Sequence, residues 1–199
     1  MQNINIIMTG IGGQGIILAS DILAETAMRM DFDVKKTDSI GMAQRGGSVI
    51  SHIRMGEEIF SPVISEGMAD ILVGMEKLES ARSCHLLKQG GKAIINRYSA
   101  PPLSVGSSGG KYPEDDIILD LIKGPAEEIF FIDGSAKTLE IGNIRTLNVF
   151  LLGALSTLLP FKTDIWQEVL EAKLPAKILE VNMKAFSLGQ KEIESARIS

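Results

Sequence analysis

The chain has 199 residues, of which 45% are hydrophobic and 23% charged, and these values are typical of one globular domain. Its net charge of −5 argues against a general affinity for nucleic acid. Cys84 is the only cysteine, which excludes an internal disulfide and a zinc or iron–sulfur cluster held by cysteines of this chain alone.

The first residues lead directly into a strand pattern rather than a signal peptide. No apolar run reaches the length of about 18 residues that a membrane span requires. We therefore expect a cytoplasmic protein with no membrane span.

A strand followed by a glycine-rich turn is the most informative stretch. Residues 4–8 form a near-continuous apolar run, as in a parallel strand that is covered on both faces, and residues 14–30 show the spacing of a helix. Between them lies a G-x-G-x-x-G pattern with one additional glycine. Its members are Gly10, Gly12, Gly13 and Gly15.

Each glycine has a physical reason to be there. Gly10 permits a tight turn, and Gly15 lets the helix pack near the strand. Gly12 and Gly13 lack Cβ atoms, so a phosphate can approach the backbone closely. The first amides of the helix have no intrahelical partners and favour an anion. The pattern therefore predicts a ligand site at the carboxyl end of the first strand, and the alternative is a turn that binds nothing.

The next segment departs from a nicotinamide-binding fold. Residues 32–37 are expected to form a second strand, and Asp38 follows at the place where such a fold binds a ribose. Asp38 is equally consistent with a turn at a strand end. Residues 48–54 and 59–62 are expected to form a β-hairpin, where a nicotinamide fold has a helix and a parallel strand. This weakens the interpretation as a dehydrogenase.

The remaining pattern is that of an α/β protein. The loop at about 97–115 is rich in Pro, Ser and Gly and is expected to be flexible. We predict a single domain over residues 1–199 with a Rossmann-like, predominantly parallel sheet, helices on both faces, an inserted β-hairpin and a helical C-terminal part. Strands are expected at 70–75, 92–96 and 129–133, and helices at 76–87, 113–123, 146–159 and, on either side of Pro175, between 163 and 189.

The sequence offers few candidates for catalysis. His52 and His85 are far apart and have no carboxylate or nucleophile pattern around them, so we expect a structural or interfacial role for His52. Cys84 is expected to be a buried, small apolar residue. There is no nucleophile elbow and no metal-ligand spacing. We therefore predict no catalytic residue and no metal ligand on this chain, which looks more like a ligand-binding subunit than a self-sufficient enzyme.

Four motifs occur in order along the chain. They are Gly10-Ile11-Gly12-Gly13-Gln14-Gly15; Arg45-Gly46-Gly47 with Ser51 and Arg54; Gly142-Asn143 with Asn148 and Leu152-Gly153-Ala154; and Asn182 with Ala185-Phe186 and Gly189. Together they resemble the gamma subunit or gamma domain of the 2-oxoacid:ferredoxin oxidoreductases. A separate chain of this length is most similar to the small, or beta, subunit of the indolepyruvate enzymes, with gamma subunits of pyruvate and 2-oxoglutarate enzymes as alternatives.

The resemblance implies a complex that oxidatively decarboxylates a 2-oxoacid, transfers the acyl group to coenzyme A and passes electrons to ferredoxin. Thiamine diphosphate, magnesium and iron–sulfur clusters would belong to large partner subunits. That division agrees with the lack of cluster cysteines and catalytic residues in this sequence. Two other classes stay open: a free-standing NAD(P)-dependent oxidoreductase, and a purely structural subunit with an empty turn.

The resemblance also implies where coenzyme A binds. The glycine turn of pyruvate-type relatives helps to hold coenzyme A, with amides near the diphosphate. Those relatives have lysines just before the double glycine, where this chain has Gln44 and Arg45. Arg45 either grips a phosphate or braces the hairpin or the partner interface. The expected cofactor-binding residues are Gly10, Gly12, Gly13, Gln14, Gly15, Ile16 and Arg45.

Overall fold

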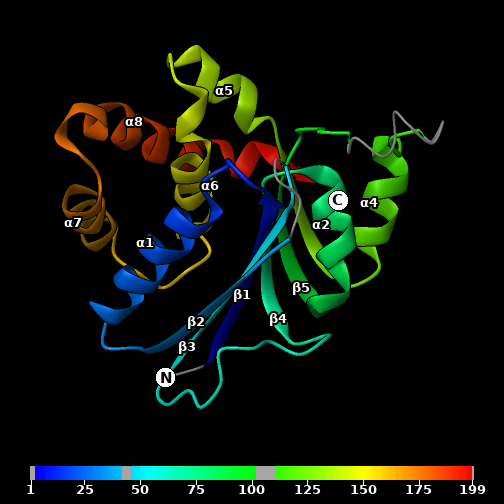
Figure 1. The fold of residues 1–199 in the computed structure, drawn as a ribbon, viewed down its shortest axis with the longest axis horizontal. Helices are drawn as coiled ribbons and strands as arrows, with labels where there is room; N and C mark the ends of the chain where they lie inside the picture. Colours follow the sequence, from blue (N-terminus) through cyan, green and yellow to red (C-terminus); the bar gives the residue numbers. More distant parts are fainter. Residues whose placement is uncertain (1–2, 42–45, 102–110, 199) are drawn as a thin grey trace.

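The computed structural model describes residues 3–41, 46–101 and 111–198. In these ranges the chain forms a seven-stranded mixed sheet in the order β2-β3-β1-β4-β5-β6-β7 (Figure 1). Strands β1, β4, β5 and β6 pair in parallel, whereas β2, β3 and β7 are antiparallel to their neighbours. The strands are β1 (Ile4–Ile11), β2 (Asp33–Ile40), β3 (Ser48–Gly56), β4 (Ala69–Gly74), β5 (Leu87–Asn96), β6 (Ala126–Ile132) and β7 (Arg197–Ile198).

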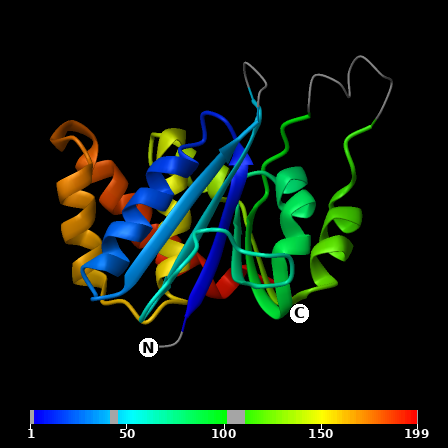
Figure 2. The ribbon, with the colours of Figure 1, turned by 60° about the horizontal axis from the view of Figure 1, so that its bottom comes forward.

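Helices cover both faces of the sheet (Figures 1 and 2). One face carries α1 (Ile16–Met28), α6 (Leu147–Ser156), α7 (Thr163–Lys173) and α8 (Ala176–Glu192), and the other carries α2 (Lys77–Ser83) and α4 (Asp115–Lys123). The shorter elements are α5 (Gly134–Glu140) and three 3₁₀ turns, η1 (Cys84–Leu86), η2 (Ile144–Thr146) and η3 (Glu194–Ala196). Among the helices described, none has both the length and the apolar character needed to cross a bilayer.

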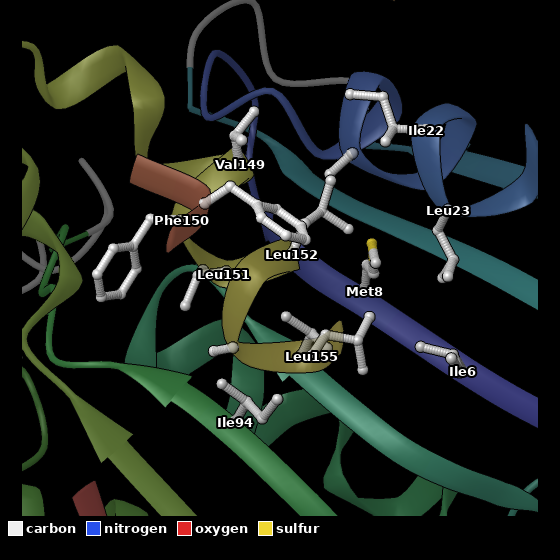
Figure 3. Close-up of a cluster of buried hydrophobic side chains, with 14 of the residues drawn as sticks. Ile6, Met8, Ile22, Leu23, Ile94, Val149, Phe150, Leu151, Leu152 and Leu155 are labelled. Carbon is white, nitrogen blue, oxygen red and sulfur yellow. The ribbon is translucent and has the colours of Figure 1, made fainter. Parts of the chain in front are cut away.

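The central strand β1 separates two cores, as its apolar run predicts. Ile6 and Met8 pack on the side of α1 and α6, whereas Ile7 packs on the side of α2 and α4. Helix α6 is buried along its whole length, which explains why its sequence is apolar on every side. Figure 3 shows side chains of β1, α1, β5 and α6 meeting in the larger core.

The α/β class, the helices on both faces and the helical C-terminal part are confirmed, but the predicted hairpin is wrong. Strand β3 pairs with β2 and β1, and residues 59–62 form no strand. Ile59 is buried and Phe60 is 87% exposed, so their alternation imitates a strand. The Ile59 N–H instead donates to the Asp33 carboxylate, and Arg54 donates to the Ser61 carbonyl. Side chains hold this segment, and no backbone ladder forms.

The structure also corrects two boundaries. Helix α2 ends at Ser83 rather than Leu87, and β5 starts at Leu87, so Gly90 and Gly91 lie inside a strand. Gly90 has a φ of 77°, and the pairing of β5 with β6 shifts register at Gly91, which identifies an irregularity in the strand. Residues 102–110 of the predicted loop lie outside the described residues, as does Arg45.

Candidate ligand-binding site

The glycine turn joins β1 to α1 at the edge where the parallel strands end (Figure 2). Gly13 and Gly15 have φ values of 98° and 78°, in the left-handed region that favours glycine. Gly15 is the N-cap residue of α1. A Cβ atom at Gly10 would lie 3.0 Å from the Met75 Cβ atom, so Gly10 is needed for close packing beneath the turn.

The side chain of Gln14 fixes the turn in place. Its Oε1 atom accepts from the Ile11 N–H at 2.8 Å, and its Nε2 atom donates to the Met75 carbonyl at 3.1 Å. The same carbonyl accepts from Asn96 Nδ2 at 3.0 Å. Gln14 therefore ties the turn to the end of β4. The sequence predicts it as a ligand contact, and the structure shows that both ends of its amide bind the backbone.

Two later motifs reach the same turn. The Gly12 N–H donates to the Gly47 carbonyl at 2.8 Å, so the double-glycine motif supports the turn from the β2–β3 side. Asn148 Nδ2 donates to the Gly15 carbonyl at 3.2 Å, and a Cβ atom at Gly15 would lie 2.6 Å from that nitrogen. The third motif therefore supports the start of α1 from helix α6.

The fourth motif positions α6. A Cβ atom at Gly153 would overlap the Phe186 carbonyl oxygen, and one at Gly189 would overlap the Phe150 carbonyl oxygen. Helices α6 and α8 thus cross with their backbones in contact, and only glycine fits at these two positions. Because Asn148 lies on α6, this crossing helps to set the position of the glycine turn.

The turn lies between two hollows of different character. The first has a volume of about 320 Å³ and includes Tyr98, Ser135 and Arg145 among its lining residues. The second, of about 350 Å³, has only apolar residues besides glycines in its lining. Gly12 and Gly13 line both hollows, whereas Gly10 lines neither. Of the predicted binding residues, Gly12 and Gly13 thus border open space on both sides, whereas Gly10 packs beneath the turn.

Three amides of the turn are available to a ligand. The Gly12 and Gln14 N–H groups are used within the protein, the latter by the Ile11 carbonyl. Over residues 3–41, 46–101 and 111–198, the N–H groups of Gly13, Gly15 and Ile16 have no acceptor. At the start of a helix such amides favour a negative charge, which fits a phosphate.

Asp38 does not occupy the position of a ribose-binding acid. Its carboxylate accepts from the Ser51 hydroxyl at 2.6 Å and from Lys36 Nζ at 2.9 Å. Burial would lower the pKa of Lys36, but the carboxylates of Asp21 and Asp38 raise it above its ordinary value. Strand β2 is also separated from β1 by β3, so Asp38 belongs to a polar network that joins β2 to α1. This geometry argues against the nicotinamide interpretation.

The histidine and the cysteine lie away from the turn. His52 Nδ1 accepts from the Ile64 N–H at 3.2 Å, and burial lowers the pKa of its imidazole. Cys84 is half-buried rather than fully buried, and burial raises the pKa of its thiol. Within the part of the chain that the structure describes, no three His, Cys, Asp or Glu side chains are grouped as metal ligands would be.

The sequence did not point to a buried carboxylate at the same edge. Glu76, the N-cap residue of α2, accepts from the Tyr112 hydroxyl at 2.5 Å and from the Ala100 N–H at 3.0 Å. Burial and the Glu76 carboxylate both raise the pKa of Tyr112. Glu76 therefore holds residues on both sides of the 102–110 segment.

Arg145 is a second residue that sequence reasoning missed. It lies between Asn143 and Asn148 of the third motif and lines the first hollow. The two asparagines were noted only because they match the family motif, and no sequence pattern marks the arginine between them. Only the fold shows that it faces the glycine turn.

The fold and the turn define an α/β domain with a candidate anion site at the carboxyl edge of its sheet. The family model described as pyruvate ferredoxin/flavodoxin oxidoreductase matches residues 5–192. The chain belongs to this family, as a gamma-type subunit of a 2-oxoacid:ferredoxin oxidoreductase.

Two curated relatives and one solved structure are similar to the chain. It is 38% identical to indolepyruvate oxidoreductase subunit IorB of Thermococcus kodakarensis, with 96% of each chain covered. Its identity to the protein of the same name from Pyrococcus horikoshii is 36%, also with 96% of each chain covered. The 2-oxoglutarate:ferredoxin oxidoreductase of Magnetococcus marinus, solved with 2-oxoglutarate, coenzyme A and succinyl-CoA bound, matches with a TM-score of 0.76 at 21% identity. That match covers 98% of this chain and 32% of the other, and it concerns the fold alone.

Proposed function

We propose that this chain is the small subunit of an indolepyruvate-type oxidoreductase and that its glycine turn helps to bind coenzyme A. The names of the two relatives at 38% and 36% identity support the substrate type. The observation that supports coenzyme A as the ligand is the turn itself, which has three unused amides and lies between two hollows. In this proposal thiamine diphosphate, magnesium and the iron–sulfur clusters lie on the large partner, and ferredoxin takes the electrons.

The residues of the turn fit a diphosphate. A Cβ atom at Gly13 would have no neighbour within 4 Å, and one at Gly12 would be 3.7 Å from the Gly47 carbonyl oxygen. Open space therefore lies above both glycines. The amides of Gly13, Gly15 and Ile16 can donate to phosphate oxygens there, while Gln14 and Asn148 keep the backbone in shape.

Coenzyme A supplies the thiol that accepts the acyl group. The contribution of this chain is to hold the diphosphate at a fixed distance from the partner, so that the thiol arm reaches the acyl group there. Positioning of this kind lowers the entropy cost of a reaction between two bound groups. It requires no proton transfer by this chain.

Reconstitution tests the subunit role. The purified chain is mixed with its large partner, and reduction of an artificial electron acceptor is measured with indolepyruvate and coenzyme A. We expect activity that depends on both substrates and exceeds that of the large subunit alone. No gain in activity on mixing would refute the role.

Gly12 offers a sharper test of the ligand than Gly15. A side chain at Gly15 would meet Asn148 in a left-handed backbone, so that variant reports on folding. Gly12 has no positive φ and no close neighbour. We expect Gly12→Leu to raise the KM for coenzyme A by about tenfold or more, with the KM for indolepyruvate unchanged, because a diphosphate pressed away from the turn loses charge-assisted hydrogen bonds. Gly12→Ala should have a smaller effect in the same direction.

The matched control is Gly124→Ala at the end of α4. Gly124 is also exposed and without positive φ, and its Cβ atom would make an ordinary contact with the Leu121 carbonyl oxygen at 3.4 Å. This variant should leave both KM values unchanged. If Gly12→Leu changed only the KM for indolepyruvate, coenzyme A would lie elsewhere.

A further inference from the structure

Arg145 stands out because its guanidinium has no partner. The other described arginines each have one: acids for Arg29, Arg82 and Arg197, an amide and carbonyls for Arg54, and the Phe131 ring for Arg97. Across residues 3–41, 46–101 and 111–198, the Arg145 side chain makes no hydrogen bond or ion pair, and its backbone N–H donates to Asn143 Oδ1 at 3.0 Å. Arg145 is exposed, so its guanidinium is accessible to a ligand.

The backbone of Arg145 is held firmly although its side chain is free. The residue lies in η2, after Gly142, whose φ is 94°. Asn143 caps this turn: its side chain accepts from the Arg145 N–H, and its carbonyl accepts from the Thr146 N–H at 3.1 Å. The Gly142-Asn143 pair of the third motif thus fixes where the arginine stands relative to the glycine turn.

The hollow beside Arg145 is suited to an anion. Gly12, Gly13 and Gln14 form one part of its lining, and Tyr98 and Ser135 form another. No carboxylate is among the lining residues. Ser135 is tied to Asn96 on both its backbone and its side chain, so this wall is rigid. An arginine that lines the same hollow as Gly13, whose amide is unused, can bind phosphate oxygens through two parallel N–H groups.

We infer that Arg145 binds a phosphate group of the ligand held at the glycine turn, and is a specificity residue for coenzyme A. This inference rests on the proposed function. Coenzyme A offers two sources of this chemistry, its diphosphate and its 3′-phosphate. Arg145 selects for a phosphorylated thiol over a simple thiol, because a neutral ligand would leave the guanidinium without its partner.

The test uses the complex assembled with the large partner. The KM values for coenzyme A and for the 2-oxoacid are compared between the wild type and Arg145→Gln. We expect the KM for coenzyme A to rise about tenfold or more, which is typical for loss of a hydrogen bond to a charged group, and the KM for the 2-oxoacid to stay within about twofold. Arg145→Lys should give an intermediate value, since an ammonium keeps the charge and loses the paired geometry.

Dephospho-coenzyme A, which lacks the 3′-phosphate, identifies the phosphate. If the effect of Arg145→Gln disappears with this analogue, Arg145 binds the 3′-phosphate. If the effect remains, Arg145 binds the diphosphate. The control is Arg29→Gln at the far end of α1, an arginine that pairs with Glu25 and Glu168 and should leave both KM values unchanged.

Two results would overturn the inference. One is an unchanged KM for coenzyme A in Arg145→Gln. The other is weaker assembly of the complex with an unchanged KM for coenzyme A once the subunits are saturating, which would make Arg145 a partner for an acid of the large subunit. Gly12→Leu separates the two claims: if it raises the KM for coenzyme A and Arg145→Gln does not, the glycine turn still binds coenzyme A and only the role of Arg145 fails.

Discussion

The substitution Gln14→Glu separates the structural role of the turn from its electrostatics. The variant keeps an acceptor for the Ile11 N–H and loses the donor to the Met75 carbonyl. Losing that hydrogen bond costs about 1 kcal/mol, and the carbonyl is not left unpaired because Asn96 still donates to it. A carboxylate at the start of α1 regains about 0.3 to 1 kcal/mol. We therefore expect the free energy of unfolding to change by no more than about 1 kcal/mol.

The effect on an anionic ligand is larger. Two unit charges about 6 Å apart repel each other by about 0.7 to 3 kcal/mol, for effective dielectric constants between about 80 and 20. This repulsion corresponds to a rise in the KM for coenzyme A of about 3-fold to 100-fold. The rise should shrink as salt is added, because ions screen the added charge.

The assay measures the KM for coenzyme A in the assembled complex at low and at high salt. The matched control is Gln14→Met, which removes both hydrogen bonds and adds no charge. That variant leaves the Ile11 N–H unpaired, so its unfolding free energy should fall by about 1 to 3 kcal/mol, and its KM for coenzyme A should depend on salt no differently from that of the wild type. An unchanged KM in Gln14→Glu, with a folded complex, would show that no anion lies at the turn.

Two further predictions concern stability. Gly153→Ala should lower the unfolding free energy by about 2 kcal/mol in urea titration, since the added methyl group overlaps the Phe186 backbone, and an unchanged midpoint would contradict the close crossing of α6 and α8. His52 has a folded pKa below its ordinary value of 6.5, so its stabilising effect is complete above pH 6.5 and is lost as pH falls through the lower folded pKa. Protonation also removes the acceptor for the Ile64 N–H. Between pH 8 and pH 5 the melting temperature should therefore fall less in His52→Gln than in the wild type or in the control His85→Gln, whose substituted side chain is exposed. An equal fall in all three proteins would refute this role of His52.

The strand, the glycine turn and the helix at the front of the chain were predictable because each depends on neighbours in sequence. Positive φ values need glycine, and a strand covered on both faces needs a continuous apolar run. The partner of β3 was not predictable in the same way. A strand was expected at residues 32–37, but β2 is polar and lies at the edge of the sheet, so nothing local in its sequence indicates that β3 pairs with it. Its partner β3 is half-buried and pairs on both sides.

The support of the turn was hidden for a different reason. Asn148 lies 133 positions along the chain from Gly15, whose carbonyl it binds, and no local sequence pattern can predict a contact between residues so far apart in sequence. Glu76 and Tyr112 are 36 positions apart and meet only because α2, which Glu76 caps, packs beside α4. The resemblance to a family indicated which residues matter, but their physical roles depend on contacts that only the fold creates.

The motif residues prove to have two kinds of role, and this decides where ligand specificity resides. Most of them keep the turn in shape: Gln14, Gly15, Asn148, Gly153 and Gly189 contact other parts of the protein. Gly12 and Gly13 line both hollows and leave space there, and the unused amides of Gly13, Gly15 and Ile16 are donors that any phosphate can use. A chain with the glycine motif is therefore expected to have the same turn, but the motif does not identify which phosphate compound binds there. In our proposal the choice of ligand falls to side chains outside the glycine pattern, and among the described residues Arg145 is the cation that lines the first hollow beside the turn.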